Sequence, residues 1–201
     1  IYYWVNKHDA KIPKDAGQVT LVLSSSIKVE GLSLSHNTQG ILLVCTNNST
    51  IEQGECSNNK YGIMLLDSRN NVVQHNSLVS NDKAIELRSA EENTIRSNSA
   101  TECGIKLKYS SKNIISGNII KESHKDVLVL SDSPNNTING NRLLENRNGI
   151  RLVRSGNNIL RNNDMLYNRH SFGVSGDIPE HFAQDIDVSN TIDLKPIYYL
   201  I

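Results

Sequence analysis

The 201-residue chain has few aromatic residues, cysteines and prolines, and no net charge. Its three cysteines, Cys45, Cys56 and Cys103, are odd in number and irregularly spaced, which excludes a disulfide framework and a Cys-x-x-Cys zinc pair. We expect them to be small buried hydrophobes. Because 21 basic side chains balance 21 acidic ones, no nucleic-acid partner is predicted. No apolar run approaches the ~18–20 residues that cross a bilayer, so no membrane insertion is predicted either.

The chain is instead rich in asparagine and serine, with 26 and 23 residues respectively. It is neither strongly charged nor rich in proline, so its composition does not favour disorder. Its length fits one domain. The composition therefore poses the question of how a chain with 37% hydrophobic and 5% aromatic residues forms a core.

A repeat of about 22 residues answers that question. A Gly-Ile-x-Leu string stands at 40–43, 62–65, 104–107 and 149–152, and degenerate copies stand at 18–21, 84–87, 126–129 and 171–174. Successive strings begin 22, 22, 22, 20, 22, 23 and 22 residues apart. Apolar residues alternate within each string, which is the periodicity of a strand, and no stretch has the periodicity of a helix.

Further apolar residues and asparagines keep the same phase. Two more apolar columns run through Val29, Ile51, Val73, Ile95, Ile115, Ile138 and Leu160, and through Leu34, Cys56, Leu78, Ala100, Ile120, Leu143 and Met165. Three polar columns contain Asn71, Asn93, Asn113, Asn136 and Asn158; Asn76, Asn98, Asn118, Asn141 and Asn163; and Asn37, Asn59, Asn81, Cys103, Ser123, Asn146 and Asn168. Each repeat thus offers three short strands and three bends.

This pattern predicts an all-β fold: a right-handed, single-stranded parallel β-helix of about seven to eight coils, with a cap at each end. Like residues stack in such a fold, so aliphatic side chains fill a narrow core without aromatics. Asparagine tolerates the left-handed backbone of bends, and its amide can bond to the coils above and below. A leucine-rich repeat is disfavoured because its Leu-x-x-Leu-x-Leu-x-x-Asn string does not recur.

Where the repeat stops, we expect end structures. Residues 1–17 are predicted to be an N-terminal cap, 18–174 the coils, and 175–201 a C-terminal cap or a segment running into the next unit of a tandem array. The array is suggested by Ile-Tyr-Tyr strings at 1–3 and 197–199. Coincidence, or a pairing motif used at both ends, is the alternative.

The repeated Gly-Ile-x-Leu…Asn-x-Ile…Asn pattern resembles the NosD-like and pectin-lyase-like β-helix superfamily. The strings at 1–7, 15–17 and 195–199 also resemble modules of archaeal, methanogen-type cell-surface proteins, which recur in tandem. This resemblance implies an extracellular location at the cell surface, with neighbouring copies of the module, and envelope glycans, as partners. Because the repeat residues are architectural, it says little about function.

No catalytic group emerges from the spacing. Glycoside hydrolysis needs two carboxylates within about 10 Å of each other. Asp67 and Asp132 share a column but lie three coils apart, about 14 Å by strand spacing. Glu86 is expected to form an exposed ion pair with Lys106, and Glu91, Glu92 and Glu102 are expected to be solvated. The chain is therefore predicted not to be an enzyme.

No metal or cofactor site is predicted either. The six histidines fall in different columns and form no His-x-His or Cys-x-x-His motif: His8, His36, His75, His124, His170 and His181. A glycan site would favour an aromatic platform, and the coils offer only Tyr61, Tyr109 and Tyr167. The sequence therefore favours a non-enzymatic structural module of a surface protein, with a carbohydrate-binding or polysaccharide-cleaving domain as the alternative.

Overall fold

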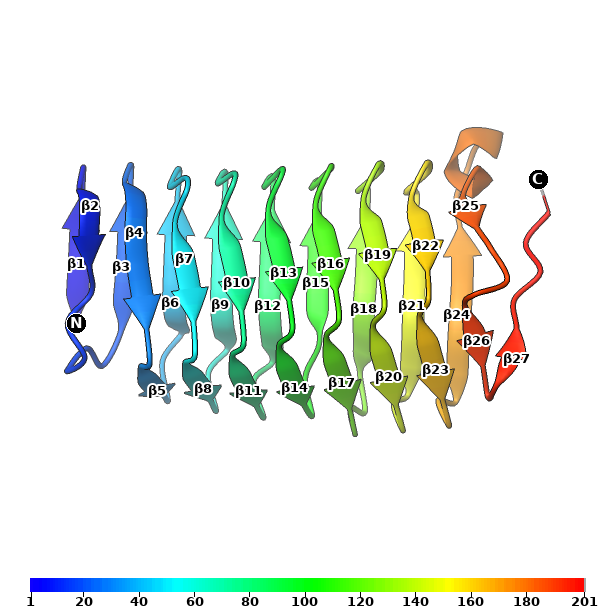
Figure 1. Cartoon of the computed structure of the whole chain (residues 1–201), viewed down its shortest axis with the longest axis horizontal. Helices are drawn as coiled ribbons and strands as arrows, with labels where there is room; N and C mark the ends of the chain where they lie inside the picture. The colour runs from blue at the N-terminus through cyan, green and yellow to red at the C-terminus, as the bar shows by residue number, and fades with distance from the viewer. Residues whose placement is uncertain (201) are drawn as a thin grey trace.

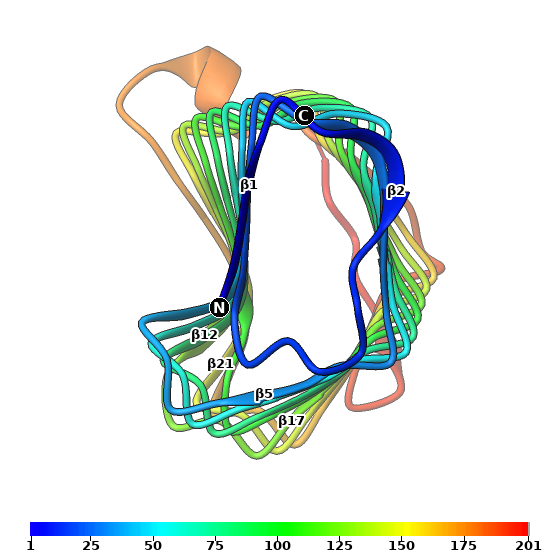
Figure 2. The same cartoon turned by 90° about the vertical axis from the view of Figure 1, so that its left-hand side faces the viewer.

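A computed structural model describes residues 1–200 as a stack of β coils (Figure 1). Each complete coil adds one strand to each of three sheets, and each sheet has nine strands. Seen from the N-terminal end, the chain turns clockwise as it recedes, so the helix is right-handed (Figure 2). The predicted parallel β-helix is confirmed. The one helical segment is a 3₁₀ turn, η1 (Pro179–Phe182), and no helix of residues 1–200 is long and apolar enough to cross a bilayer.

Sheet A contains the strands that begin each repeat. They are β1 (Tyr2–Val5), β3 (Val19–Val22), β6 (Gln39–Val44), β9 (Tyr61–Leu66), β12 (Lys83–Arg88), β15 (Ile105–Lys108), β18 (Asp126–Ser131), β21 (Asn148–Val153) and β24 (His170–Ser175). All neighbours in this sheet are parallel, as repeated coils require.

Sheets B and C contain the shorter strands. Sheet B is formed by β2 (His8–Lys11), β4 (Ser25–Glu30), β7 (Thr50–Glu52), β10 (Val72–Gln74), β13 (Thr94–Arg96), β16 (Ile114–Ser116), β19 (Thr137–Asn139), β22 (Ile159–Arg161) and β25 (Asp185–Ile186). Sheet C is formed by β5 (Ser33–Ser35), β8 (Glu55–Ser57), β11 (Ser77–Val79), β14 (Ser99–Thr101), β17 (Ile119–Lys121), β20 (Arg142–Leu144), β23 (Asp164–Leu166), β26 (Thr191–Ile192) and β27 (Lys195–Pro196).

The observed register corrects one copy of the repeat. Leu128, not Val127, pairs with Ile105 of the previous coil, so the copy begins at 127 rather than 126. Leu128 consequently points inward and is fully buried, while Val129 takes the outward position. The sequence was ambiguous here because residues 127–130 are all aliphatic, and either phase satisfies the alternation.

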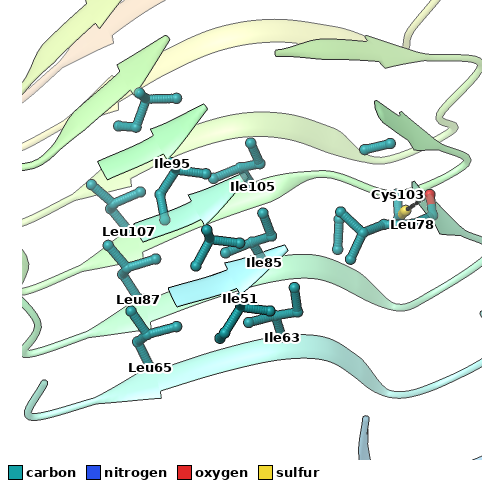
Figure 3. Packing of buried hydrophobic residues seen from close by; sticks show 14 of the residues in the cluster. Ile51, Ile63, Leu65, Leu78, Ile85, Leu87, Ile95, Cys103, Ile105 and Leu107 are labelled. Carbon is teal, nitrogen blue, oxygen red and sulfur yellow. Dashed lines mark hydrogen bonds between the residues drawn. The ribbon is translucent and has the colours of Figure 1, made fainter. Parts of the chain in front are cut away.

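Stacked aliphatic side chains form the core, as predicted. Figure 3 shows Leu65, Leu87 and Leu107 one above another, beside a second stack that contains Ile63, Ile85 and Ile105. All six side chains are buried. Burial of one such side chain contributes about 1.5–3 kcal/mol, so the repeated columns supply the stabilisation that aromatics supply elsewhere. Cys56 and Cys103 belong to this core, whereas Cys45 is only half-buried.

The asparagine columns form ladders, but the left-handed bends belong to other residues. In Asn98, for example, Nδ2 donates to the Val73 carbonyl at 2.9 Å and to Asn118 Oδ1 at 3.0 Å. The positive φ lies one residue earlier, at Ser97 (53°) next to Asn98 and at His75 (54°) next to Asn76. The ladder asparagine therefore holds the bend together while its neighbour adopts the strained conformation.

A fourth ladder of hydroxyl groups was missed by the sequence analysis. It contains Ser24, Thr46, Ser68, Ser110, Ser133 and Ser155, and several of these hydroxyls accept from a backbone N–H one coil away, as between Thr46 and Ser68 at 3.0 Å. Ala90 interrupts the column. Serine is common in bends for several reasons, so its phase alone did not reveal the ladder.

The terminal segments extend the sheets. Within residues 1–17, β1 pairs with β3 and β2 pairs with β4, so this segment forms part of a further coil. Within residues 175–201, β25 and β26 extend sheets B and C, and β27 folds back antiparallel on β26. The ring of Tyr199 packs edge-on against that of Phe172, with 6.5 Å between the ring centroids, and Ile197 also contacts the core.

Candidate functional site

Cations gather on the outer side of sheet A and on the turns that lead into it. We call this surface the basic face, and it is defined by Lys83, Arg88, Lys106, Lys108, Lys125, Arg147, Arg151 and Arg169. The carboxylates on the same strands and turns are Asp82, Glu86, Glu102, Glu122, Asp126 and Glu145. Viewed along the axis, the turns between sheets C and A project beside one margin of this face, and η1 projects beside the other at the C-terminal end (Figure 2). At its C-terminal end the basic face thus lies between two projecting segments of the backbone.

Glu86 does not form the exposed ion pair with Lys106 that the sequence suggested. Its side chain is buried, and its carboxylate pairs with Arg88 at 2.9 Å and with Lys83 at 3.6 Å. This hydrogen bond raises the pKa of the Arg88 guanidinium. The Lys83 ammonium also lies over the ring of Tyr61, 4.5 Å from its centroid. Lys106, which is in register with Glu86, forms no ion pair within residues 1–200.

A hollow of about 370 Å³ lies at the C-terminal end of the basic face. Arg147, Arg151, His170 and Phe172 are among its lining residues, together with Asn148 and Gly173. Arg151 donates to Asp126 at 3.1 Å, which fixes its guanidinium on the face. Asp126, Asn148 and His170 are successive residues of one column, so the histidine stands one strand beyond that of Arg151 and two strands beyond Asp126. The hollow combines anion-binding groups with an imidazole.

A second hollow of about 190 Å³ lies in the middle of the same face. It results from the short repeat: the turn between β14 and β15 lacks the two residues that Asp82 and Lys83 occupy one coil earlier. Lys125 bridges the gap and donates to Asp82 at 2.9 Å, which lowers the pKa of that carboxyl. Lys106 and Val129 are among the residues that line the hollow.

The carboxylates and tyrosines singled out from the sequence do not assemble into one site. Asp132 accepts two hydrogen bonds from Arg154, at 2.7 and 3.0 Å, and this pairing lowers its pKa. Asp67 stands three coils away, as predicted. Tyr109 and Tyr167 are exposed in separate columns, and only Tyr61 lies on the basic face.

Comparison with known proteins gives a family match. The model of the family described as "Periplasmic copper-binding protein (NosD)" matches residues 5–103 and 99–183. Among curated proteins, no sequence relative was found.

Several solved structures share the fold. DFA-IIIase from Arthrobacter chlorophenolicus A6, in complex with GF2, is 13% identical, with a TM-score of 0.66 over 86% of this chain and 56% of its own. A tailspike protein of E. coli bacteriophage HK620 is 12% identical, with a TM-score of 0.62 over 94% and 48%. The periplasmic alginate epimerase AlgG is 21% identical, with a TM-score of 0.53 over 80% and 39%. The chain thus spans between 39% and 56% of these proteins, and at such identities the likeness shows the fold alone.

These neighbours contradict the prediction that the chain is not an enzyme. They are mostly carbohydrate-processing proteins, including an epimerase and DFA-IIIase. The prediction rested on finding no pair of carboxylates at hydrolytic spacing. Such a pair is needed for glycoside hydrolysis, so its absence says nothing of chemistry that arginine and histidine side chains, such as those of the C-terminal hollow, support.

The donor set does not fit the copper ion of the family description. Within residues 1–200, no three His, Cys, Asp or Glu side chains are close enough to hold a metal. The pKa of the Cys56 thiol is raised to about 12 by burial, and burial also raises the pKa of the Cys103 thiol, which disfavours the thiolate that binds copper. Met64 and Met165 are buried as well.

Proposed function

We propose that the chain is a carbohydrate-processing domain that acts on an extended acidic polysaccharide. It belongs to the NosD family, and it shares its β-helix fold with an alginate epimerase and with DFA-IIIase. The polymer lies along the basic face, parallel to the axis of the rod. The alignment of cations on one face, in a chain without net charge, carries this proposal. A neutral polymer would gain nothing from that arrangement.

The C-terminal hollow is the reaction site in this proposal. The planar guanidinium groups of Arg147 and Arg151 suit the carboxylate of a hexuronate. Their positive charge stabilises the enediolate that forms when the carbon next to that carboxylate loses its proton. His170, which lines the same hollow, accepts the proton. Return of a proton to the other side of the carbon epimerises the sugar, and loss of the C4 substituent with the electron pair cleaves the chain.

The experiment compares anionic and neutral polysaccharides of the same length. We expect the 201-residue protein to bind polyuronates and to give either epimerised sugar, detected by NMR, or an unsaturated product, detected by its ultraviolet absorbance. His170→Ala should abolish turnover but leave binding within about twofold, whereas Arg151→Gln should weaken binding about fivefold. His75→Ala, on an exposed turn between sheets B and C and so away from the basic face, is the matched control.

Equal binding of neutral and anionic polymers would contradict the proposal. So would turnover that is unchanged in His170→Ala, since no other imidazole lines that hollow.

The setting of the domain is also a proposal. The periplasmic description of the family supports a location outside the cytoplasm. A cell-surface location, neighbouring copies of the module as partners, and an archaeal source stay predictions from the sequence.

A further inference from the structure

The central hollow is a consequence of one deletion in the repeat. The turn from sheet C into sheet A that precedes β15 is two residues shorter than the same turn one coil earlier. The row of projecting turns is therefore interrupted at that coil. The interruption is bridged by the ion pair between Lys125 and Asp82, which are 43 residues apart in sequence. The hollow therefore lies at the shortened turn, beside the strand that carries Lys106.

One of the cations that line the central hollow lacks an ion-pair partner within residues 1–200. Lys83 is engaged by Glu86, Lys125 by Asp82, and Asp126 by Arg151. Lys106 is the lining cation that forms no ion pair within residues 1–200. It lacks a partner because Glu86, its neighbour across the strands, is buried against Lys83 and Arg88. An ammonium group beside a hollow is thus available to an external anion.

The position of Lys106 relative to the C-terminal hollow is fixed by the register. Lys106, Val129 and Arg151 occupy one outward column on three successive strands. Two strand spacings separate Lys106 from Arg151, which is about 10 Å along the axis. This separation is close to the length of two sugar rings in an extended chain. Val129 lies between them in the same column and is buried.

We propose that the central hollow is a second carboxylate subsite, in which Lys106 binds a hexuronate two sugars away from the one held by Arg151. This inference rests on the proposed function, and it adds the length and charge spacing of the polymer. The two subsites together select a chain with a carboxylate on the first and third of three consecutive sugars. In a ligand long enough to reach both subsites, the second contact is intramolecular and forms at a high effective concentration, so the ligand binds more tightly than a shorter one.

The test measures the affinity of the 201-residue protein for hexuronate oligomers, from the disaccharide to the octasaccharide, by calorimetry. We expect a step in affinity between the disaccharide and the tetrasaccharide. Lys106→Gln should remove the step and weaken the tetrasaccharide about fivefold, with the disaccharide unchanged. Lys106→Arg should retain the step. Lys112→Gln removes the same charge from the same coil, at an exposed turn outside the basic face, and should also retain the step.

Each result separates the two proposals. If Lys106→Gln and Lys112→Gln bind every oligomer alike, the second subsite is overturned. If long polyuronate binds the wild-type protein but affinity has no step with length, the subsite is again overturned while the proposed function stands. If neither the oligomers nor long polyuronate bind, both proposals fall.

Discussion

Single asparagines hold the coils of this protein in register. The Asn98 side chain accepts from the backbone N–H of Asn76 at 3.0 Å and donates to the carbonyl of Val73 at 2.9 Å. It is buried, so no water can replace either bond. Backbone groups at a bend have no strand partner of their own, and the amide supplies one in each direction.

Replacement of Asn98 by Ala should therefore destabilise the protein strongly. The Asn76 N–H loses its acceptor, and we expect a loss of about 1–3 kcal/mol for each polar group left unpaired. Urea unfolding followed by circular dichroism measures this loss. Asn139→Ala is the control, because Asn139 is exposed and outside the ladders; its cost should stay below about 0.5 kcal/mol. Equal costs for the two variants would show that the ladder contributes no stability.

Charges on the outer side of sheet B form a row across its strands. Glu30 on β4 and Glu52 on β7 face each other in register, which is unfavourable for like charges. Lys28 lies between them, 3.3 Å from Glu30 and 2.9 Å from Glu52. Lys11 also pairs with Glu30, and Gln74 donates to Glu52 at 2.6 Å. The row turns a repulsive pair into an attractive network.

This row makes the stability depend on pH. Hydrogen bonds from Lys11 and then Lys28 lower the pKa of Glu30, and those from Lys28 and then Gln74 lower that of Glu52. Both pKa values are lowered by folding, so the contribution is present above the ordinary glutamate value of 4.5 and is lost as the pH falls through the lowered values.

In Lys28→Met the two glutamates repel each other. We expect a lower urea midpoint than in the wild type at pH 7, and a difference that shrinks toward acid pH as the carboxylates take up protons. Lys7→Met, at an exposed position outside the row, is the control. A difference that is constant with pH would contradict the role of the network.

The arrangement of charge over the whole molecule matters more than its sum. The chain has no net charge, yet sheet A presents a basic face while sheet B carries a balanced row. Overall attraction to a polyanion is therefore absent, and attraction depends on the basic face. Ladders, strands and short bends keep this face straight along the stack of coils.

Binding of polyuronate should accordingly weaken with salt. The Debye length falls from about 30 Å at 0.01 M to about 8 Å at 0.15 M, and we expect the affinity to fall by about tenfold or more over that range. The double variant Arg147→Gln/Arg151→Gln should show a much smaller salt dependence. Lys14→Gln, an exposed residue of the first coil, should behave as the wild type. Affinity independent of salt would argue against binding through the basic face.

The periodic spacing of the residues in this protein determines its coils, so the sequence alone was sufficient to predict the fold. Each stacked column repeats one residue type at a fixed interval, so the three strands, the core and the asparagine ladders could be read without coordinates. Ambiguity entered only where a column was degenerate, as at residues 127–130, or shared its residue type with ordinary bends, as in the serine ladder.

Tertiary structure decided the candidate site. The repeat predicts which residues are neighbours within a column, and on that basis Glu86 was paired with Lys106. The Glu86 carboxylate instead pairs with Lys83 and Arg88 of its own strand, which leaves Lys106 without an ion pair within residues 1–200. The bridge from Lys125 to Asp82 spans two coils across a shortened turn, which no repeat spacing describes. The charged group of a long side chain can lie several ångströms from its own backbone, so its ion-pair partner depends on the three-dimensional arrangement of the surface and not on the repeat spacing.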